Sequence, residues 1–319
     1  MTTQRVRNFV PSSKQWLKRV PEDLPAHARE DSHGHNWGGE TWFPGKKKPY
    51  RLVPGDHPEL EGVWYGFQGK TSWGETGTLW HANAYNIAGK IDGLTVWRIG
   101  DFVKGREGHG LYLRCVPSLD TTIRNYRAFK IGGQAVQREW RTSETEIPKA
   151  DWIEGGGQFL LENCVAKETG LIDTGTGGNA VRASWAFSLY NTMQHTTVRN
   201  VRHYNYHSPA PHEGSLFLGY GYNSWRTPSL LVESFRSFVN DRDRPEVFLE
   251  GVDDALFQGR GVILYGPDPW IDVTEDCGKV TIDRIATDVT VRMKRSSNPH
   301  GAPKYTERVR AGETKTFNP

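Results

Sequence analysis

Long apolar runs and cysteines are both scarce in this chain. Its 319 residues include three Cys, and no apolar stretch approaches the roughly 20 residues that a membrane-spanning helix needs. The opening residues, 1–5, are polar where a signal peptide would lead into an apolar core. The sequence therefore predicts neither a membrane span nor a secretory signal.

The cysteines Cys115, Cys164 and Cys277 lie far apart and form no CxxC pair. Each lies in a segment with the pattern of a strand, where a thiol between apolar neighbours is usually inert. We expect reduced core thiols, folding in a reducing compartment, and no metal or other cofactor.

Aromatic residues are abundant, and charge is unevenly distributed. The chain has 12 Trp, 12 Tyr and 13 Phe, enough surface to bury for a folded protein. Residues 1–20 carry +5 and residues 289–319 carry +5, which leaves −7 between them. Basic ends are typical of segments that dock on an acidic partner. Nucleic-acid binding is not expected, because basic and aromatic residues form no known module.

The first 62 residues are rich in proline and show no period of 2 or 3.6, which predicts an extended N-terminal arm. Large aromatic side chains on a polar arm need a groove to fill, so we expect the arm to dock on another protein. Residues 294–319 are predicted to be a basic C-terminal tail. The predicted docking residues are Arg5, Arg7, Trp16, Lys18, Arg19, Trp37 and Trp42.

Between residues 63 and 293 the chain is a succession of short apolar-alternating runs, and almost nothing there has the pattern of a helix. The clearest runs are 94–99, 110–113, 121–126, 158–162, 196–201, 229–233 and 279–285. Weaker companions are 134–140, 179–187, 214–220, 246–252 and 261–265. The body is therefore predicted to be all-β.

Two of these runs are near-copies, Thr-Thr-Ile-Arg-Asn at 121–125 and Thr-Thr-Val-Arg-Asn at 196–200. Taking Val96, Ile123, Leu161, Val198, Leu231 and Ile282 as markers, the runs recur at 27, 38, 37, 33 and 51 residues. A β-sandwich would need more tight hairpin turns than the one Asp-Gly present. Recurrence without hairpins indicates stacked coils, with Asn125, Asn163 and Asn200 stacked at one corner.

These repeats and the glycine-punctuated coils from about residue 79 to 293 resemble the right-handed parallel β-helix, the pectin-lyase-like superfamily of phage virion and tailspike type. The resemblance implies an all-β solenoid with an N-terminal arm. It also implies one of two functions: a structural virion protein, or a polysaccharide lyase or glycoside hydrolase. The family includes both, so the fold does not choose between them.

Catalytic candidates are weak. The segment 203–213 holds His203, His207, His212 and Glu213, but the spacing matches no zinc signature. Asp253 and Asp254 offer paired carboxylates for sugar hydrolysis without the other elements expected of such enzymes. A stripe with Arg199, Arg202 and Arg236 has the alternating charge of an ordinary solvated strand.

The charge distribution, the arm and the reduced thiols together favour a virion structural protein, for example a capsid decoration or tail-associated protein. We expect it to fold in the host cytoplasm, to join other virion proteins through its arm, and not to be an enzyme. A homotrimer is compatible with the resemblance. Because sugar rings stack on aromatic faces, we also expect binding of a host or environmental polysaccharide. The predicted glycan-binding residues are Tyr204, Tyr206, Tyr220, Tyr222 and Trp225.

Overall fold

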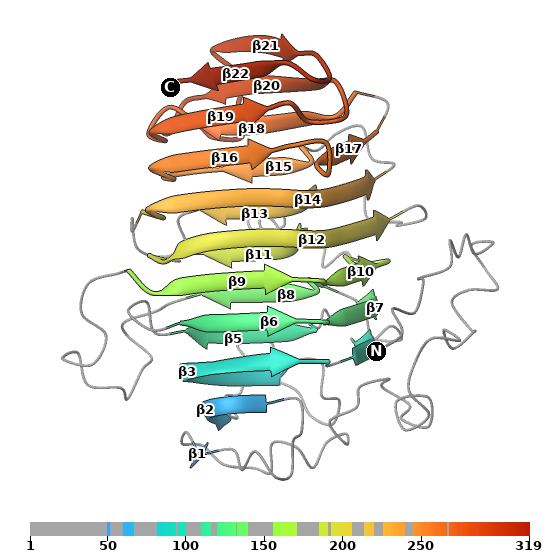
Figure 1. The fold of residues 1–319 in the computed structure, drawn as a ribbon. Coiled ribbons are helices and arrows are strands. Elements are labelled where there is room, and N and C mark those ends of the chain that lie inside the picture. Colours follow the sequence, from blue (N-terminus) through green and yellow to red (C-terminus); the bar gives the residue numbers. More distant parts are fainter. Residues whose placement is uncertain are drawn as a thin grey trace.

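A computed structural model of the chain describes residues 50–51, 60–66, 82–93, 95–99, 110–115, 120–131, 133–139, 156–170, 185–190, 193–205, 214–219, 226–239, 245–266 and 268–319. These residues form an all-β structure without helices, so none of them belongs to a helix that could cross a membrane. The strands stack in successive layers, from β1 at the bottom to β21 at the top of Figure 1.

Strands of successive layers pair in parallel in three columns. Column 1 consists of residues 82–86 of β3 (Ala82–Asp92), then β5 (Leu111–Cys115), β8 (Val136–Glu139), β11 (Trp185–Tyr190), β13 (Gly214–Gly219), β15 (Val247–Leu249), β18 (Trp270–Thr274) and β20 (Val289–Lys294). Column 2 consists of residues 89–92 of β3, then β6 (Thr121–Arg124), β9 (Gln158–Glu162), the first half of β12 (His195–Asn205), the first half of β14 (Ser229–Val239), β16 (Asp254–Gln258) and β19 (Lys279–Asp283).

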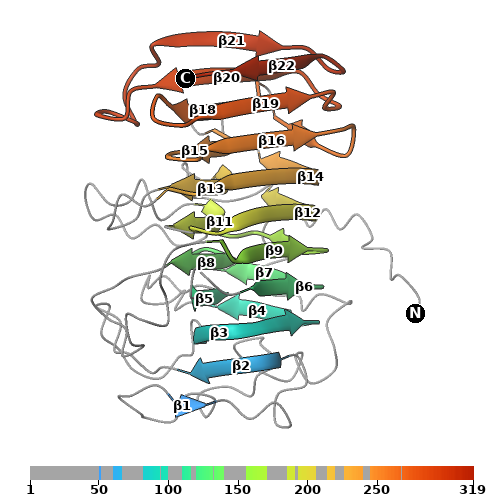
Figure 2. The same cartoon turned by 60° about the vertical axis from the view of Figure 1, so that its left-hand side comes forward.

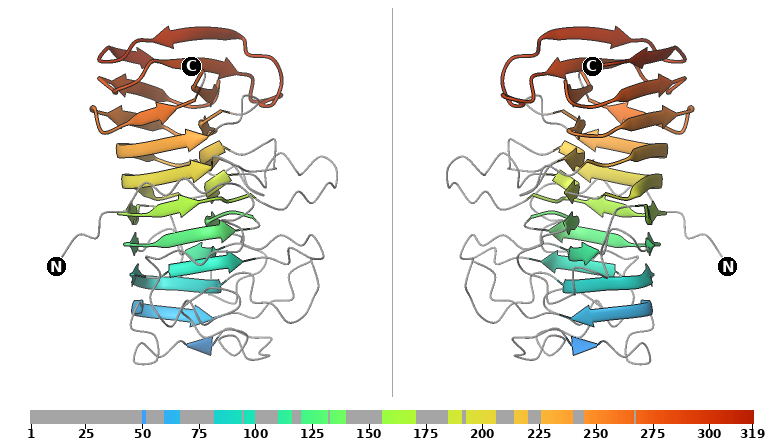
Figure 3. Two further views of the ribbon diagram at one scale, coloured as in Figure 1. Left: turned by 90° about the vertical axis from the view of Figure 1, so that its right-hand side faces the viewer. Right: turned by 90° about the vertical axis from the view of Figure 1, so that its left-hand side faces the viewer.

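Column 3 is the shortest. It consists of β4 (Thr95–Ile99), β7 (Arg127–Ile131), β10 (Val165–Lys167), the second halves of β12 and β14, and β17 (Ile263–Tyr265). It runs along the right-hand side of the stack in Figure 1, the side that faces the viewer in the left panel of Figure 3. Thus one strand per column and layer recurs along the chain.

Alternating burial explains why these segments form strands. In β9 and β19 every second side chain is buried, and the apolar members of each strand point into the space that the columns enclose. Ile123, Leu161 and Val198 lie in register on adjacent layers and are fully buried, which confirms them as equivalent positions. The runs that the sequence analysis identified from 94 to 285 all contain strands.

The structure corrects two of the predicted markers and one of the predicted intervals. Val96 lies in column 3, opposite Ala128, and the true partner of Ile123 is Ile91. Leu231 pairs with Thr197 on the outer side, so the interior equivalent of Val198 is Val232. The 51-residue interval before Ile282 spans two layers, because Asp254–Gln258 forms a further strand. The sequence analysis did not identify this strand, because Asp253 and Asp254 at its start interrupt the apolar alternation.

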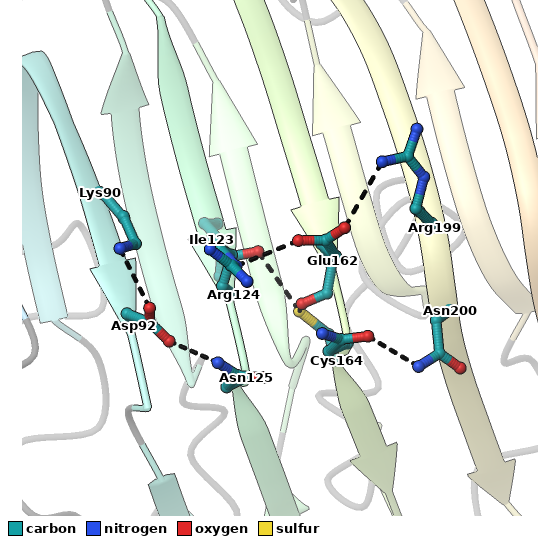
Figure 4. Close-up of polar contacts among 10 residues, drawn as sticks. Lys90, Asp92, Ile123, Arg124, Asn125, Glu162, Cys164, Arg199 and Asn200 are labelled. Atoms are coloured by element: carbon teal, nitrogen blue, oxygen red, sulfur yellow. Dashed lines mark hydrogen bonds and ion pairs between the residues drawn. The ribbon is translucent and has the colours of Figure 1, made fainter. Parts of the chain in front are cut away.

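The corner between columns 2 and 3 is built from residues with left-handed backbone. Asn125, Asn163 and Asn200 have φ values of 51°, 56° and 50°, a region that asparagine tolerates better than most residues. The Asn200 side-chain amide donates to Asn163 Oδ1 at 2.7 Å, and Asn125 donates to Asp92 Oδ1 at 2.6 Å (Figure 4). The predicted stacking of these asparagines is therefore confirmed for Asn163 and Asn200.

On the outer side of column 2, acidic and basic residues alternate from layer to layer next to this corner. Arg124 contacts Glu162 at 3.0 Å, and Arg199 contacts the same glutamate at 3.5 Å (Figure 4). On its other side Arg199 contacts Glu233 at 2.9 Å. Each pair is partly exposed, so its contribution to stability is at most about 1 kcal/mol. The arrangement leaves the row close to neutral.

Antiparallel strands close both ends of the described stack. β2 (Leu60–Gly66) pairs antiparallel with β3, and β1 (Tyr50–Arg51) with β2. At the other end β21 (Tyr305–Val309) and β22 (Thr314–Phe317) pair antiparallel with β20 and β19 (Figure 2). The basic segment 294–319 thus contributes two strands, with Val309 and Phe317 buried in the core.

Candidate functional site

The outer side of column 3 carries a row of aromatic side chains. The row is set by strand register, since the second outward position of each layer falls on the same line. Its aromatic members, layer by layer, are Phe129, Tyr204, Phe238 and Tyr265, and Lys167 occupies the layer between Phe129 and Tyr204. Tyr204 was among the residues predicted to bind glycan.

The rings of this row stack on one another. The centroids of Tyr204 and Phe238 are 4.9 Å apart with an interplanar angle of 14°, and those of Phe238 and Tyr265 are 4.3 Å apart with an angle of 15°. The Lys167 ammonium lies 5.7 Å from the ring centroids of both Phe129 and Tyr204. The faces of the inner rings are therefore occupied by their neighbours.

Tyr265 ends the row and is 45% exposed. No strand follows β17 in column 3 within the part of the chain that the structure describes, while columns 1 and 2 continue. One face of the Tyr265 ring stacks on Phe238, so its outer side is the part of the row that a flat ligand can cover. A supported, rigid ring is a good platform for a sugar, because little side-chain freedom is lost on binding.

A second outward row on column 3 is basic. In register it reads Arg127, Val165, Arg202, Arg236 and Ile263. The sequences of β7, β10, β17 and the second halves of β12 and β14 contain no Asp or Glu. The described outer side of column 3 is thus cationic and aromatic, in contrast to the near-neutral row on column 2.

His203, a predicted catalytic candidate, points into the stack instead of outward. It is fully buried, with Nδ1 2.8 Å from Ser215 Oγ and Nε2 3.1 Å from Thr169 Oγ1. Ser215 Oγ is 2.5 Å from Ser237 Oγ, and both hydroxyls donate to Glu246. Burial lowers the pKa of His203 to about 3, so the imidazole is neutral at pH 7. Its position inside the layers separates it from any polysaccharide on the surface.

Asp253 and Asp254, the other described catalytic candidates, are exposed and lie at the start of β16. Arg226 forms an ion pair with Asp253, and Lys279 on the next layer lies 3.5 Å from Asp254. Successive side chains of a strand point to opposite sides, and each of these carboxylates faces a different cation. The two side chains do not form a facing acid pair.

The remaining predicted site residues lie outside the described residues. They are the catalytic candidates His207, His212 and Glu213, the glycan candidates Tyr206, Tyr220, Tyr222 and Trp225, and the docking residues Arg5, Arg7, Trp16, Lys18, Arg19, Trp37 and Trp42. The structure places none of them.

Sequence reasoning missed Phe238 and Tyr265, although the sequence contains a pattern that points to Phe238. The outward aromatic follows the corner residue by four positions, as in Asn125 to Phe129 and Asn200 to Tyr204. Ser234, with a φ of 53°, occupies the same corner and leads to Phe238 in the same way. This offset could be used only once the corner had been recognised.

The two described cysteines, Cys164 and Cys277, are buried free thiols whose surroundings disfavour the thiolate. Cys164 Sγ lies 3.3 Å from the carbonyl oxygen of Glu162 and 3.6 Å from that of Ile123 (Figure 4). Burial raises the pKa of Cys164 to about 12, and it also raises the pKa of Cys277. Among the described side chains, no group of three or more His, Cys, Asp or Glu is arranged to hold a metal ion.

Comparison with known proteins gives no relative for this chain: no family model matches it, and neither a curated protein nor a solved structure does. The site therefore has to be interpreted from its own geometry.

Proposed function

We propose that the chain is a right-handed parallel β-helix of the pectin-lyase-like type and serves as a structural virion protein that binds polysaccharide on column 3. The solenoid is supported by the recurrence of one strand per column and layer. Right-handedness is supported by the strong general preference of parallel strand connections for that hand. The asparagine corner repeats in the same register.

The observation that carries polysaccharide binding is the stacked aromatic row that ends in exposed Tyr265. Sugars present apolar C–H faces that pack on aromatic rings, and hydroxyl groups that accept hydrogen bonds from cationic side chains. The outer side of column 3 offers both kinds of group. Catalysis receives no such support, because the described catalytic candidates are buried or paired with cations.

The virion role is supported by the charge distribution, since two basic ends flank an acidic body. Basic ends can dock on acidic virion proteins, while an acidic body resists self-association. In this proposal the chain folds in the cytoplasm of a phage host and joins a capsid or tail through residues 1–62.

Polysaccharide binding is tested with a panel of neutral and acidic polysaccharides against the full chain. Tyr265→Ala should weaken binding at least tenfold. Tyr305→Ala is the matched control, because Tyr305 is 46% exposed but lies on the closing strand β21. Equal effects of the two substitutions, or none from Tyr265→Ala, would reject column 3 as the binding face.

The virion role is tested by sizing native material before any affinity step. Recovery in a megadalton particle, and its loss when residues 1–50 are deleted, is the expected result. Recovery of the intact chain only as a free protein, or normal assembly of the truncated chain, would contradict docking through the arm.

A further inference from the structure

The outer side of column 2 faces the viewer in Figure 1, and no other described strand lies over it. The middle outward position of each strand carries a partly exposed side chain, and three of these side chains are leucines. Outward positions of a solvated sheet are normally polar, so leucines there favour a face that contacts another surface. This middle row, in register from β6 to β19, consists of Thr122, Leu160, Thr197, Leu231, Leu256 and Thr281.

Two polar rows flank the middle row, and every member of them is at least partly exposed. The row at the strand starts consists of Asp120, Gln158, His195, Ser229, Asp254 and Lys279. The row at the strand ends consists of Arg124, Glu162, Arg199, Glu233, Gln258 and Asp283. The face therefore has the anatomy of a protein interface, a less polar centre between polar rims.

The two flanking rows carry opposite charges where both are charged. In the β6 layer the strand-start row has Asp120 and the strand-end row has Arg124. In the β19 layer the signs are reversed, with Lys279 at the start and Asp283 at the end. The members of each pair are four residues apart along the chain, about 13 Å in an extended strand, so they cannot contact each other within one copy.

Three further layers set a carboxylate in one row against a neutral hydrogen-bond donor in the other. These pairs are Gln158 with Glu162, Ser229 with Glu233, and Gln258 with Asp254. Only the β12 layer sets two nitrogen-bearing side chains, His195 and Arg199, in the two rows. The strand-start row is thus the complement of the strand-end row in five of these six layers.

A twofold axis parallel to the stack brings the two rows together. It places a second copy face to face on column 2, with each layer opposite its own equivalent and the strand direction reversed. The strand starts of one copy then lie opposite the strand ends of the other. The middle row meets itself, so that Leu160, Leu231 and Leu256 each lie opposite the same leucine of the second copy.

The interactions along the stack within one copy persist in this arrangement. Arg124 and Arg199 contact glutamates of their own copy, and each guanidinium has further N–H donors for a second carboxylate. The seven layers from β3 to β19 and the five residues of each strand give a face of about 29 Å by 17 Å. This size is at the low end for specific interfaces, so we expect a dimer that dissociates on dilution.

We propose that column 2 is a self-association face through which two copies of this chain form a twofold dimer with parallel stacks. The dimer uses a different face from the aromatic row of column 3 and does not depend on polysaccharide binding. A threefold ring would bring two different faces together and leave the match between the two flanking rows unused.

The test is analytical ultracentrifugation of the full chain over a concentration series, at a moderate salt concentration that screens the repulsion between acidic bodies. The expected result is a reversible equilibrium between monomer and dimer. Leu231→Asp should weaken the dimer about tenfold or more, because it sets two carboxylates opposite each other in the middle row. A trimer, or a monomer at every concentration, would overturn the proposal.

Ile263→Asp is the matched control, because Ile263 is also a partly exposed aliphatic residue on an outward position, but lies on column 3. It should leave the dimer unchanged, and thermal melting checks that both aspartate variants are folded. Equal weakening by Leu231→Asp and Ile263→Asp would show that column 2 is not the contact face.

His195→Glu tests the orientation of the two copies by a gain of affinity, which a folding defect cannot imitate. In the proposed dimer the new carboxylate lies opposite Arg199 of the second copy, and it should tighten the dimer about tenfold. His195→Gln adds no charge and should have little effect. Antiparallel stacks would set each flanking row on itself, away from Arg199, so a dimer that His195→Glu does not tighten would overturn the parallel arrangement.

Discussion

The buried His203 should make the protein less stable in acid, and the size of the effect follows from its surroundings. The imidazole is fully buried and contacts the hydroxyls of Thr169 and Ser215, with Glu246 reached only through the serines. Burial lowers its folded-state pKa from 6.5 to about 3. The substitution to test is His203→Gln, which keeps a polar side chain of similar length and cannot be protonated.

The sign follows from proton binding. Between pH 6.5 and about 3 the unfolded chain binds a proton at this histidine and the folded chain does not. The free energy of unfolding therefore falls as the pH decreases, by about 1.4 kcal/mol per pH unit within this window. From pH 7 to pH 4 the loss attributable to His203 is about 3 kcal/mol.

Asp272 opposes this trend and has to be separated from it. Burial raises its pKa to about 6, despite Lys294 at 3.8 Å. The folded state therefore binds more protons than the unfolded state at this group between pH 3.8 and about 6, and its contribution becomes more favourable as the pH falls. The intact protein alone can thus show little net pH dependence in this range.

The measurement is urea unfolding of the intact protein and of His203→Gln at pH 7, 6, 5 and 4. The difference between the two proteins cancels Asp272 and isolates His203. Whatever the variant costs at pH 7, it should gain about 3 kcal/mol relative to the intact protein by pH 4. A difference that stays constant over the series would show that His203 is not buried as a neutral group, and would refute the argument.

Three further predictions concern the asparagine corner, a buried thiol and a glycine that lies close to another backbone segment. Asn200→Ala should lower the free energy of unfolding, measured in urea, by about 1–2 kcal/mol. Asn200→Gly should lower it by less, because glycine tolerates the left-handed φ of 50°. Equal losses for the two variants would locate the whole effect in the side-chain hydrogen bond. Cys164 should resist iodoacetamide at pH 8 in the folded protein and react once urea unfolds it, since burial raises its pKa to about 12; alkylation of the native protein at the rate of a free thiol would contradict this burial. Gly278→Ala should destabilise the protein by roughly 2 kcal/mol or more, because a Cβ there would lie 2.1 Å from the Asp253 carbonyl oxygen; an unchanged melting temperature would show that the backbone adjusts freely.

The predicted strands depended on local patterns and were largely recovered. Alternation with period 2 identified the run 158–162, and the near-copies at 121–125 and 196–200 identified equivalent corners. Where the alternation is masked by polar residues, as at Asp254, the strand was missed. Leu231 was the wrong choice of interior marker, because its neighbour Val232 is equally apolar. Only the pairing register shows that Val232 is the one that points inward.

The candidate site depended on contacts between layers that no local pattern contains. Tyr204 could be chosen from its sequence neighbourhood, but its actual partner Phe238 lies 34 residues away, and Tyr265 a further 27. His203 looks like a surface residue in its polar segment, yet register places it opposite Ser237 in the interior.

The amino-acid sequence by itself determined that this protein is built of strands and that certain segments are equivalent, because alternation and repetition are properties of neighbouring residues. Only the tertiary structure decided which side chains meet on the surface. Arg199 and Arg202 are almost adjacent in the chain, but the corner at Asn200 sends them to different columns, one among glutamates and the other beside a second arginine. A side chain's electrostatic environment is set by the layers above and below it, and those layers are about 25 to 40 residues away along the chain.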